Sequence, residues 1–134
     1  MNNLQKTEKQ VVGAIGEDTA CKYLQQHGHT IITRNYRKKW GEIDIISKKK
    51  GNLHFIEVKT VSRENLEKVN HETDAYRPEE NVHPKKLQRL ARTVQTYLLE
   101  KDIEDTNWQL DVVAVYLNLK AKKAKVWVTE DVIM

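Results

Sequence analysis

The sequence predicts a single domain of the α/β or α+β class, in which helices pack against one mixed sheet. The chain has 134 residues, which is the length of one compact domain with its own core. Two segments show the helical spacing of apolar residues, and five short segments have the composition of strands. A helix lies between strands, and this order favours a right-handed crossover and therefore a mixed sheet.

The first half of the chain contains the first helix and a strand hairpin. The helix is expected to begin at Thr7, which has capping-box spacing to Gln10. It ends near His27, because Gly28 is suited to the end of a helix. Residues 48–52 have the composition of a turn, so the strands on either side should pair as a hairpin. The three strands expected here are 31–36, 42–47 and 53–59.

The second half begins with a long polar segment. Residues 61–82 show no clear period and are expected to form a mobile loop within the domain. Pro84 suits the first turn of a second amphipathic helix. Strands follow at 108–117 and 124–129, and the first is apolar enough to be central. The apolar residues with helical spacing in the second helix are Leu87, Leu90, Val94, Tyr97 and Leu98.

Composition limits the function classes. The formal net charge of +4 and the pI of about 9.1 suit a partner with phosphates without requiring one. No apolar run approaches the roughly 20 residues that span a bilayer, and the first residues lack the apolar stretch of a secretory signal. We therefore expect a cytoplasmic protein without membrane contact. The one cysteine, Cys21, excludes an internal disulfide framework and is expected to be buried.

Asp44, Glu57 and Lys59 form the clearest chemical pattern. Side chains alternate along a strand, so Glu57 and Lys59 should share a face, and Asp44 should point away from Ile43 and Ile45. Two carboxylates on neighbouring strands can hold one hard cation, Mg²⁺ or Mn²⁺, which activates water and neutralises phosphate charge. Lys59 would orient the attacking water or stabilise added negative charge. The open alternative is a solvated Glu-x-Lys ion pair beside a strand-edge aspartate.

Glu17 is a third candidate, on the first helix. It shares helical spacing with Gly13 and Ala20, and small residues on this stripe allow the helix to approach the sheet closely. A charged group on a packing stripe needs compensation, either a metal-bound water or a basic partner across the gap. A surface position on the helix is the remaining alternative.

Four sequence blocks together resemble a known family. They are Gly13-x-x-Gly16-Glu17, Arg34-Asn35-Tyr36, Gly41-Glu42-Ile43-Asp44-Ile45-Ile46 and Phe55-Ile56-Glu57-Val58-Lys59-Thr60. With weaker matches elsewhere, they make the chain similar to the YraN-type family of uncharacterised bacterial proteins over about residues 11 to 115. That family is a predicted branch of the PD-(D/E)xK nuclease-like superfamily, akin to archaeal Holliday-junction resolvases.

The resemblance implies a restriction-endonuclease-like αβββαβ core with a single mixed sheet flanked by helices. By position, it implies Asp44 and Glu57 as metal ligands and Lys59 as the catalytic lysine. Glu17 would be the helix carboxylate of the resolvases, a further catalytic group and metal ligand. Lys86 would be a supporting basic group on the second helix.

Two other polar residues are interpreted as structural or exposed. Asp111, in the apolar strand, is expected to have a structural role. The family commonly has Arg-Phe before it, whereas this chain has Gln109-Leu110, a change expected to remove a partner of Asp111. His54, near the third strand, is expected to be exposed, and the five histidines show no metal-ligand spacing on one element.

The first functional hypothesis is a divalent-metal-dependent endonuclease that hydrolyses phosphodiester bonds in nucleic acid, with branched or structured DNA as the expected substrate. A non-cleaving nucleic-acid-binding or protein-interaction module on the same fold is the alternative, and an assembly role as a homodimer is the third. Trp40 either stacks on an unpaired base or packs against the protein. The basic residues that would contact phosphates, or else form a solvated face, are Arg34, Arg37, Lys38, Lys39, Lys85, Lys86 and Arg89.

Overall fold

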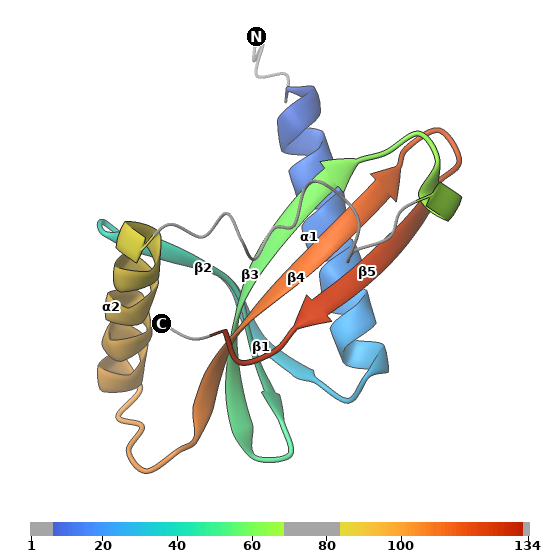
Figure 1. The fold of residues 1–134 in the computed structure, drawn as a ribbon. Helices are drawn as coiled ribbons and strands as arrows, with labels where there is room; N and C mark the ends of the chain where they lie inside the picture. Colours follow the sequence, from blue (N-terminus) through green and yellow to red (C-terminus); the bar gives the residue numbers. More distant parts are fainter. Residues whose placement is uncertain (1–6, 69–83, 133–134) are drawn as a thin grey trace, which may run out of the picture.

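The computed structural model describes residues 7–68 and 84–132, which form one five-stranded sheet and two α-helices (Figure 1). The strands lie in chain order across the sheet; β3 and β4 are parallel and the other neighbours are antiparallel. The α/β class, the αβββαβ order and the mixed sheet are therefore confirmed. The elements are α1 (Glu8–Gln26), β1 (Thr30–Lys38), β2 (Gly41–Lys49), β3 (Asn52–Ser62), the 3₁₀ helix η1 (Leu66–Lys68), α2 (Pro84–Glu100), β4 (Trp108–Asn118) and β5 (Lys123–Thr129).

Helix α1 begins and ends where the local sequence predicts. The backbone N–H of Gln10 donates to Oγ1 of Thr7 at 3.2 Å, and the backbone N–H of Thr7 donates to Oε1 of Gln10 at 2.9 Å. This pair is the expected capping box, which satisfies two backbone donors at the helix start. After the last turn, Gly28 has a φ of 91°, a left-handed conformation that favours glycine.

The two helices cover opposite faces of the sheet. The neighbouring residues Phe55 and Ile56 of β3 point to opposite faces. Ile56 packs in a cluster with Leu24 of α1, whereas Phe55 packs with Val94 and Tyr97 of α2. Figure 1 shows α1 behind the strands and α2 beside one end of β2. We call the two sides of the sheet the α1 face and the α2 face.

Strands β2 and β3 separate partway along the sheet. Their pairing runs from Lys49 and Asn52 to Ile45 and Ile56, and it stops there. Beyond this level β2 pairs with β1 and β3 pairs with β4, and Figure 1 shows β2 turning toward α2. We call this divergence the fork.

The regular alternation of β2 is interrupted at the fork. Ile45 packs in the α1-face cluster, whereas Ile43 and Ile46 pack in the α2-face cluster. The expectation that Ile43 and Ile45 share a face is therefore wrong. The cause is local. Strand β2 separates from β3 at this level, and on β1 the residue opposite Asp44, Asn35, has a left-handed φ of 54°.

Two glycines allow the helices to contact the sheet closely beside the fork. A Cβ on Gly16 of α1 would overlap the side chain of Thr60 on β3. A Cβ on Gly41 of β2 would overlap Oγ1 of Thr93 on α2 and approach the backbone of Arg89. Because neither position has room for a side chain, Gly16 sets the distance of α1 from β3 and Gly41 sets that of α2 from β2.

The segment expected to be a loop from residue 61 begins later. Strand β3 continues to Ser62, and η1 follows because Leu66 packs against Ala114 and Tyr116 of β4. The rest of that predicted loop, residues 69–82, lies outside the described part of the chain. Neither described helix combines the length and the apolar character that crossing a membrane requires.

Candidate active site

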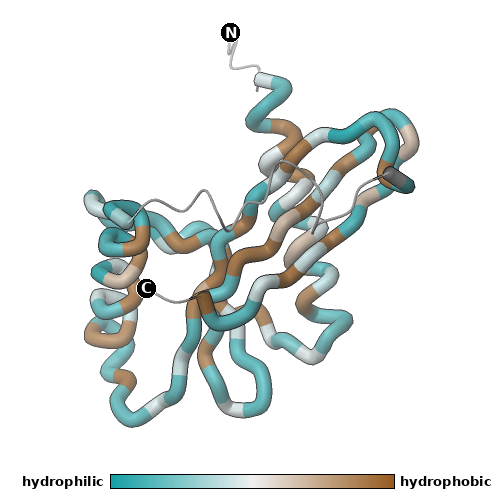
Figure 2. Tube along the Cα trace, in the orientation of Figure 1, coloured by the Kyte–Doolittle hydropathy of each residue, from teal (hydrophilic) through white to brown (hydrophobic). Residues whose placement is uncertain are grey.

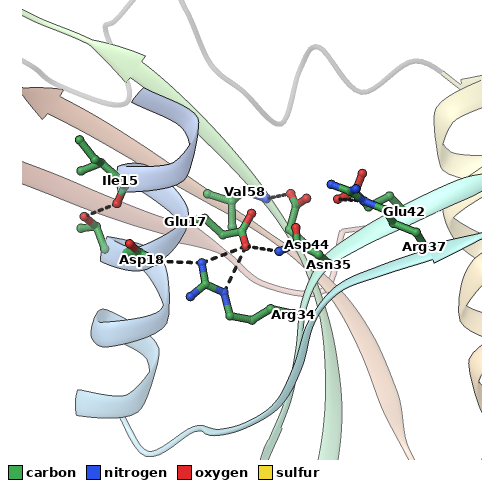
Figure 3. A network of polar contacts seen from close by, with 10 residues as sticks. Ile15, Glu17, Asp18, Arg34, Asn35, Arg37, Glu42, Asp44 and Val58 are labelled. Atoms are coloured by element: carbon green, nitrogen blue, oxygen red, sulfur yellow. Dashed lines mark hydrogen bonds and ion pairs between the residues drawn. The ribbon is translucent and has the colours of Figure 1, made fainter. Parts of the chain in front are cut away.

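Asp44 lies at the fork, where its carboxylate provides the contact that strand pairing no longer does. Its Oδ2 accepts a hydrogen bond of 2.7 Å from the backbone N–H of Val58 on β3 (Figure 3). Asp44 and Glu57 line one pocket of about 170 Å³, together with Lys86 and Arg89 of α2. The hairpin thus brings two carboxylates from neighbouring strands to a common opening, as the sequence predicts.

The environment of Asp44 disfavours its charged form. Burial raises the pKa of the Asp44 carboxyl to about 7, and the nearby negative charge of Glu57 adds to the rise. The hydrogen bond from Val58 acts in the opposite direction. A carboxylate in this situation gains stability from a nearby cation, because the cation offsets both burial and repulsion.

Glu57 is buried and is held by two ammonium groups. Its Oε1 lies 2.8 Å from Nζ of Lys86 and 3.3 Å from Nζ of Lys59. The second contact agrees with the expectation that Glu57 and Lys59 share a face. Burial and the nearby charge of Lys86 lower the pKa of Lys59. Burial opposes the charge of Lys86, but its hydrogen bond to Glu57, its contact with Lys59 and the negative charges of Glu57 and Asp44 together raise its pKa.

Each of the two carboxylates keeps one oxygen uncommitted. Within the described residues, Oδ1 of Asp44 and Oε2 of Glu57 have no hydrogen bond or ion pair. Mg²⁺ in proteins commonly takes one or two carboxylate oxygens and keeps water or substrate oxygens in its other positions. The donor set and the open pocket therefore fit a hard divalent cation held by Asp44 and Glu57.

Glu17 has a basic partner across the gap, which is one of the two compensations expected for it. Its Oε1 accepts from Nη2 of Arg34 at 3.0 Å and from Nδ2 of Asn35 at 3.1 Å (Figure 3). Arg34 also contacts Asp18 at 2.8 Å. Glu17 still acts on the site, since its charge contributes to the raised pKa of Asp44. In residues 7–68 and 84–132, no three carboxylate, imidazole or thiolate groups gather as a metal-binding set.

The basic residues expected to contact phosphates fall into two groups. Four form ion pairs with acidic side chains: Arg34 with Glu17 and Asp18, Arg37 with Glu42, Lys38 with Glu100, and Lys86 with Glu57. Arg89 is exposed and lines the pocket, and Lys39 and Lys85 are exposed nearby in sequence. Arg89 is therefore the exposed candidate phosphate contact that lines the pocket of the two carboxylates.

Trp40 packs against α2. The guanidinium of Arg92 lies 4.2 Å from the centre of its ring, a cation–π geometry. Its indole Nε1 is buried and has no hydrogen-bond partner in the part of the chain that the structure describes. Of the two interpretations of Trp40, the structure favours packing over base stacking.

A buried polar network crosses three strands at the other end of the sheet. Nδ1 of His29 lies 2.8 Å from Oγ of Ser47, the His29 and His54 rings meet edge to face, and Nδ1 of His54 lies 2.7 Å from Oδ2 of Asp111. His54 is buried, so its expected exposure is wrong; it lies between β2 and β4, and Asp111 satisfies its polar ring. Asp111 has a structural role, and Gln109 is one of its partners rather than a lost one, donating at 2.8 Å. The sequence carries no spacing signal for this network, because its members come from separate elements.

The αβββαβ order and the mixed sheet define an α/β protein whose arrangement is consistent with a restriction-endonuclease-like core. The chain belongs to a family described as Uncharacterised protein family UPF0102, whose model matches residues 16–115. This confirms the resemblance to the YraN-type family.

Similar proteins are found in several bacteria. A UPF0102 protein of Campylobacter jejuni is 38% identical over 103 residues, which cover 77% of this chain and 81% of that protein. A UPF0102 protein of Persephonella marina is 33% identical over 108 residues, covering 81% of this chain and 85% of that protein. The solved structure of Pyrococcus furiosus SfsA in complex with Ca²⁺ matches 92% of this chain and 64% of that chain, just under two thirds, with 15% identity and a TM-score of 0.36. A TM-score of this size does not establish a shared fold.

Proposed function

We propose that this protein is a divalent-metal-dependent endonuclease that hydrolyses phosphodiester bonds in nucleic acid, with DNA as the expected substrate. One observation carries the proposal: Asp44 and Glu57 open into one pocket beside Lys59 and Lys86, and each keeps one oxygen that no described residue contacts. This arrangement fits the Asp…Glu-x-Lys pattern of the PD-(D/E)xK superfamily, which the sequence resembles.

Each residue has a separate task in this proposal. Asp44 and Glu57 would hold Mg²⁺ or Mn²⁺, which supplies Lewis-acid chemistry toward water and phosphate. Lys59, whose pKa is lowered, positions its ammonium beside Glu57 to orient the attacking water or to stabilise negative charge. Lys86 holds Glu57 in place, and Arg89 at the pocket binds a substrate phosphate.

A non-cleaving module remains the second candidate, and one contact favours it. Glu57 is already neutralised by Lys59 and Lys86, so the charged cluster has no strict need for a metal. In that case the basic residues around the pocket would bind nucleic acid or an acidic protein without cutting it.

The test is cleavage of a panel of labelled substrates by wild type, Asp44→Asn, Lys59→Ala and Lys22→Ala. The panel contains single strands, duplexes, flaps and four-way junctions of DNA, with RNA counterparts, in Mg²⁺ or Mn²⁺ and in EDTA. Lys22 is exposed on α1 and does not line the pocket of Asp44 and Glu57. Lys22→Ala removes the same charge as Lys59→Ala and is therefore the matched control. We expect the two site variants to lose at least about 100-fold in rate, because charge stabilisation in a nuclease site is worth that much.

The pattern across the variants separates the two candidates. Metal-dependent cleavage by wild type and Lys22→Ala, with loss in both site variants, supports the nuclease. Equal traces from all four proteins would mean contamination, and binding without cleavage would support the module.

A further inference from the structure

Trp127 of β5 projects from the α2 face of the sheet. Its neighbours Val126 and Val128 pack against the α1-face cluster, and side chains alternate along a strand, so Trp127 points to the other side. It is 44% exposed, although a large aromatic side chain on a sheet is usually more buried. Figure 2 shows the alternation of hydrophilic and hydrophobic residues along β5.

Trp127 lies in the same row of the sheet as the candidate catalytic lysine. Lys59 pairs with Ala114 of β4, and Ala114 pairs with Trp127 of β5. Val58 packs on the α1 face, so Lys59 and Trp127 share the α2 face. With neighbouring strands about 4.8 Å apart, their Cα atoms are separated by roughly 10 Å across the sheet.

Positive charge accompanies Trp127 along the same face. Lys125 and Lys123 are exposed at alternate positions of β5, and alternation places them on the side of Trp127. Lys125 pairs with Tyr116, and the guanidinium of Arg63 lies 5.9 Å from the centre of the Tyr116 ring. An exposed aromatic ring followed by a line of cations complements a polyanion with stacking bases.

We propose that Trp127, Lys125 and Lys123 bind an unpaired stretch of the substrate strand beside the candidate active site. The inference rests on the proposed function, and it narrows the substrate to nucleic acid with a single-stranded segment next to the cut. Proteins that bind single strands combine aromatic stacking with a basic track for the phosphates, and stacking tolerates any base sequence. Lysine side chains along one strand supply that track without reading sequence.

The first test measures binding without cleavage, in EDTA at low salt, by fluorescence anisotropy. The probes are a blunt DNA duplex and the same duplex with a single-stranded tail. Trp127→Ala should weaken binding of the tailed probe by about 5- to 50-fold, because stacking of one or two bases is lost. Binding of the blunt probe should stay within about twofold. Ile32→Ala is the matched control, since Ile32 is also 44% exposed and lies on β1, the opposite edge strand.

Conservative variants separate stacking from general apolar contact. Trp127→Phe should keep most of the affinity for the tailed probe, and Trp127→Leu should lose as much as Trp127→Ala. Lys125→Ala should make the salt dependence shallower by about 0.7 in the slope of log K against log salt concentration, the value for one phosphate contact of a single strand. Lys22→Ala, on α1, should leave the slope unchanged.

Three results would overturn the inference. The first is equal affinity of wild type and Trp127→Ala for the tailed probe, and the second is full affinity of Trp127→Leu for that probe. The third is a change in the molecular mass of Trp127→Ala by light scattering, which would mean that the ring contacts a second copy of the protein. The fate of the nuclease proposal is read separately. If Asp44→Asn abolishes cleavage but Trp127→Ala binds the tailed probe as wild type does, this inference is refuted and the nuclease proposal is not. If Trp127→Ala weakens binding of the tailed probe but wild type shows no metal-dependent cleavage, only the nuclease proposal is refuted.

Discussion

At the scale of single residues, the candidate site contains two acids with different surroundings. Asp44 is half-buried beside another acid and has one backbone donor, whereas Glu57 is compensated by two lysines. Their separate surroundings mean that Asp44 gains more from an added cation than Glu57 does. Asp44 is therefore the residue at which a metal would have the larger electrostatic effect.

His29 gives a pH-dependent prediction that does not involve the candidate site. Burial lowers the pKa of His29 to about 4, with smaller contributions from the charges of His54 and Lys49. The folded state therefore binds the proton more weakly than the unfolded chain, in which the pKa is about 6.5. The contribution of neutral His29 to folding stability is fully present above pH 6.5, the pKa in the unfolded chain. This contribution is lost as the pH falls from about 6.5 to about 4.

We expect His29→Gln to flatten this acid dependence. Relative to the variant, wild type should lose up to about 1.4 kcal/mol of unfolding free energy per pH unit within that window. Urea unfolding at pH 7.5, 6, 5 and 4.5 measures the difference. His27→Gln is the control, since His27 is exposed two residues earlier and should follow wild type. Parallel curves for wild type and His29→Gln would refute the assignment.

At the scale of elements, close contact between helix and strand positions the site. Gly16 allows α1 to lie directly on Thr60, one residue after Lys59. Gly41 allows α2 to lie on β2 and so brings Lys86 and Arg89 to the pocket. Both glycines are thus constraints of packing rather than of backbone conformation.

Gly16→Ala and Gly13→Ala test this constraint on the same helix. Gly13 has nothing within 4 Å of an added Cβ, so Gly13→Ala should stabilise the protein by about 0.5–1 kcal/mol through helix propensity. Gly16→Ala should destabilise it by about 1–3 kcal/mol, because the methyl group forces α1 away from β3. Thermal unfolding measures both, and the double variant Gly16→Ala/Thr60→Ala should recover part of the loss. Equal Tm values for the two glycine variants would show that the contact is unimportant.

The same scale shows what the sequence could and could not predict. Apolar periodicity and turn residues predicted both α-helices and all five strands of the described chain, but not η1, and strand alternation placed Glu57 and Lys59 on one face. The fork was not predictable, because side-chain alternation holds for a strand that stays paired. Strand β2 leaves β3 beyond Ile45, and Ile43 therefore lies on the α2 face rather than on the face of Ile45. The contact of Glu17 with Arg34 and the burial of His54 depend on tertiary neighbours, which no local spacing reports.

At the scale of the whole molecule, the charge available for a polyanion is smaller than the number of basic residues suggests. Among residues 7–68 and 84–132, at least four of the seven residues predicted to contact phosphates are in ion pairs with acids. Arg89, Lys39 and Lys85 are exposed on the side of α2 and the β1–β2 turn. We therefore expect this protein, with a net charge of +4, to bind nucleic acid through only a few phosphate contacts.

The salt dependence of DNA binding measures this number. If the exposed residues Arg89, Lys39 and Lys85 each contact one phosphate of a duplex, the slope of log K against log salt should be near −2.7, which is a loss of roughly 40-fold in affinity between 50 and 200 mM. Anisotropy titrations of a blunt duplex at four salt concentrations give the slope, and light scattering at the same salts checks that a monomer–dimer change does not contribute. A flat dependence would exclude electrostatic binding of nucleic acid by this surface.

The fork places the two acids on parts of the sheet whose strand pairing, in the described residues, is continuous only through the paired segment of β2 and β3. Asp44 lies on β2, which pairs with β1 beyond the fork, while Glu57 and Lys59 lie on β3, which pairs with β4. A small bend in the β2–β3 hairpin would therefore change the distance between the two carboxylates. A cation bound between them would fix that distance, so its binding should slow amide hydrogen exchange in both strand pairs, β1–β2 and β3–β4.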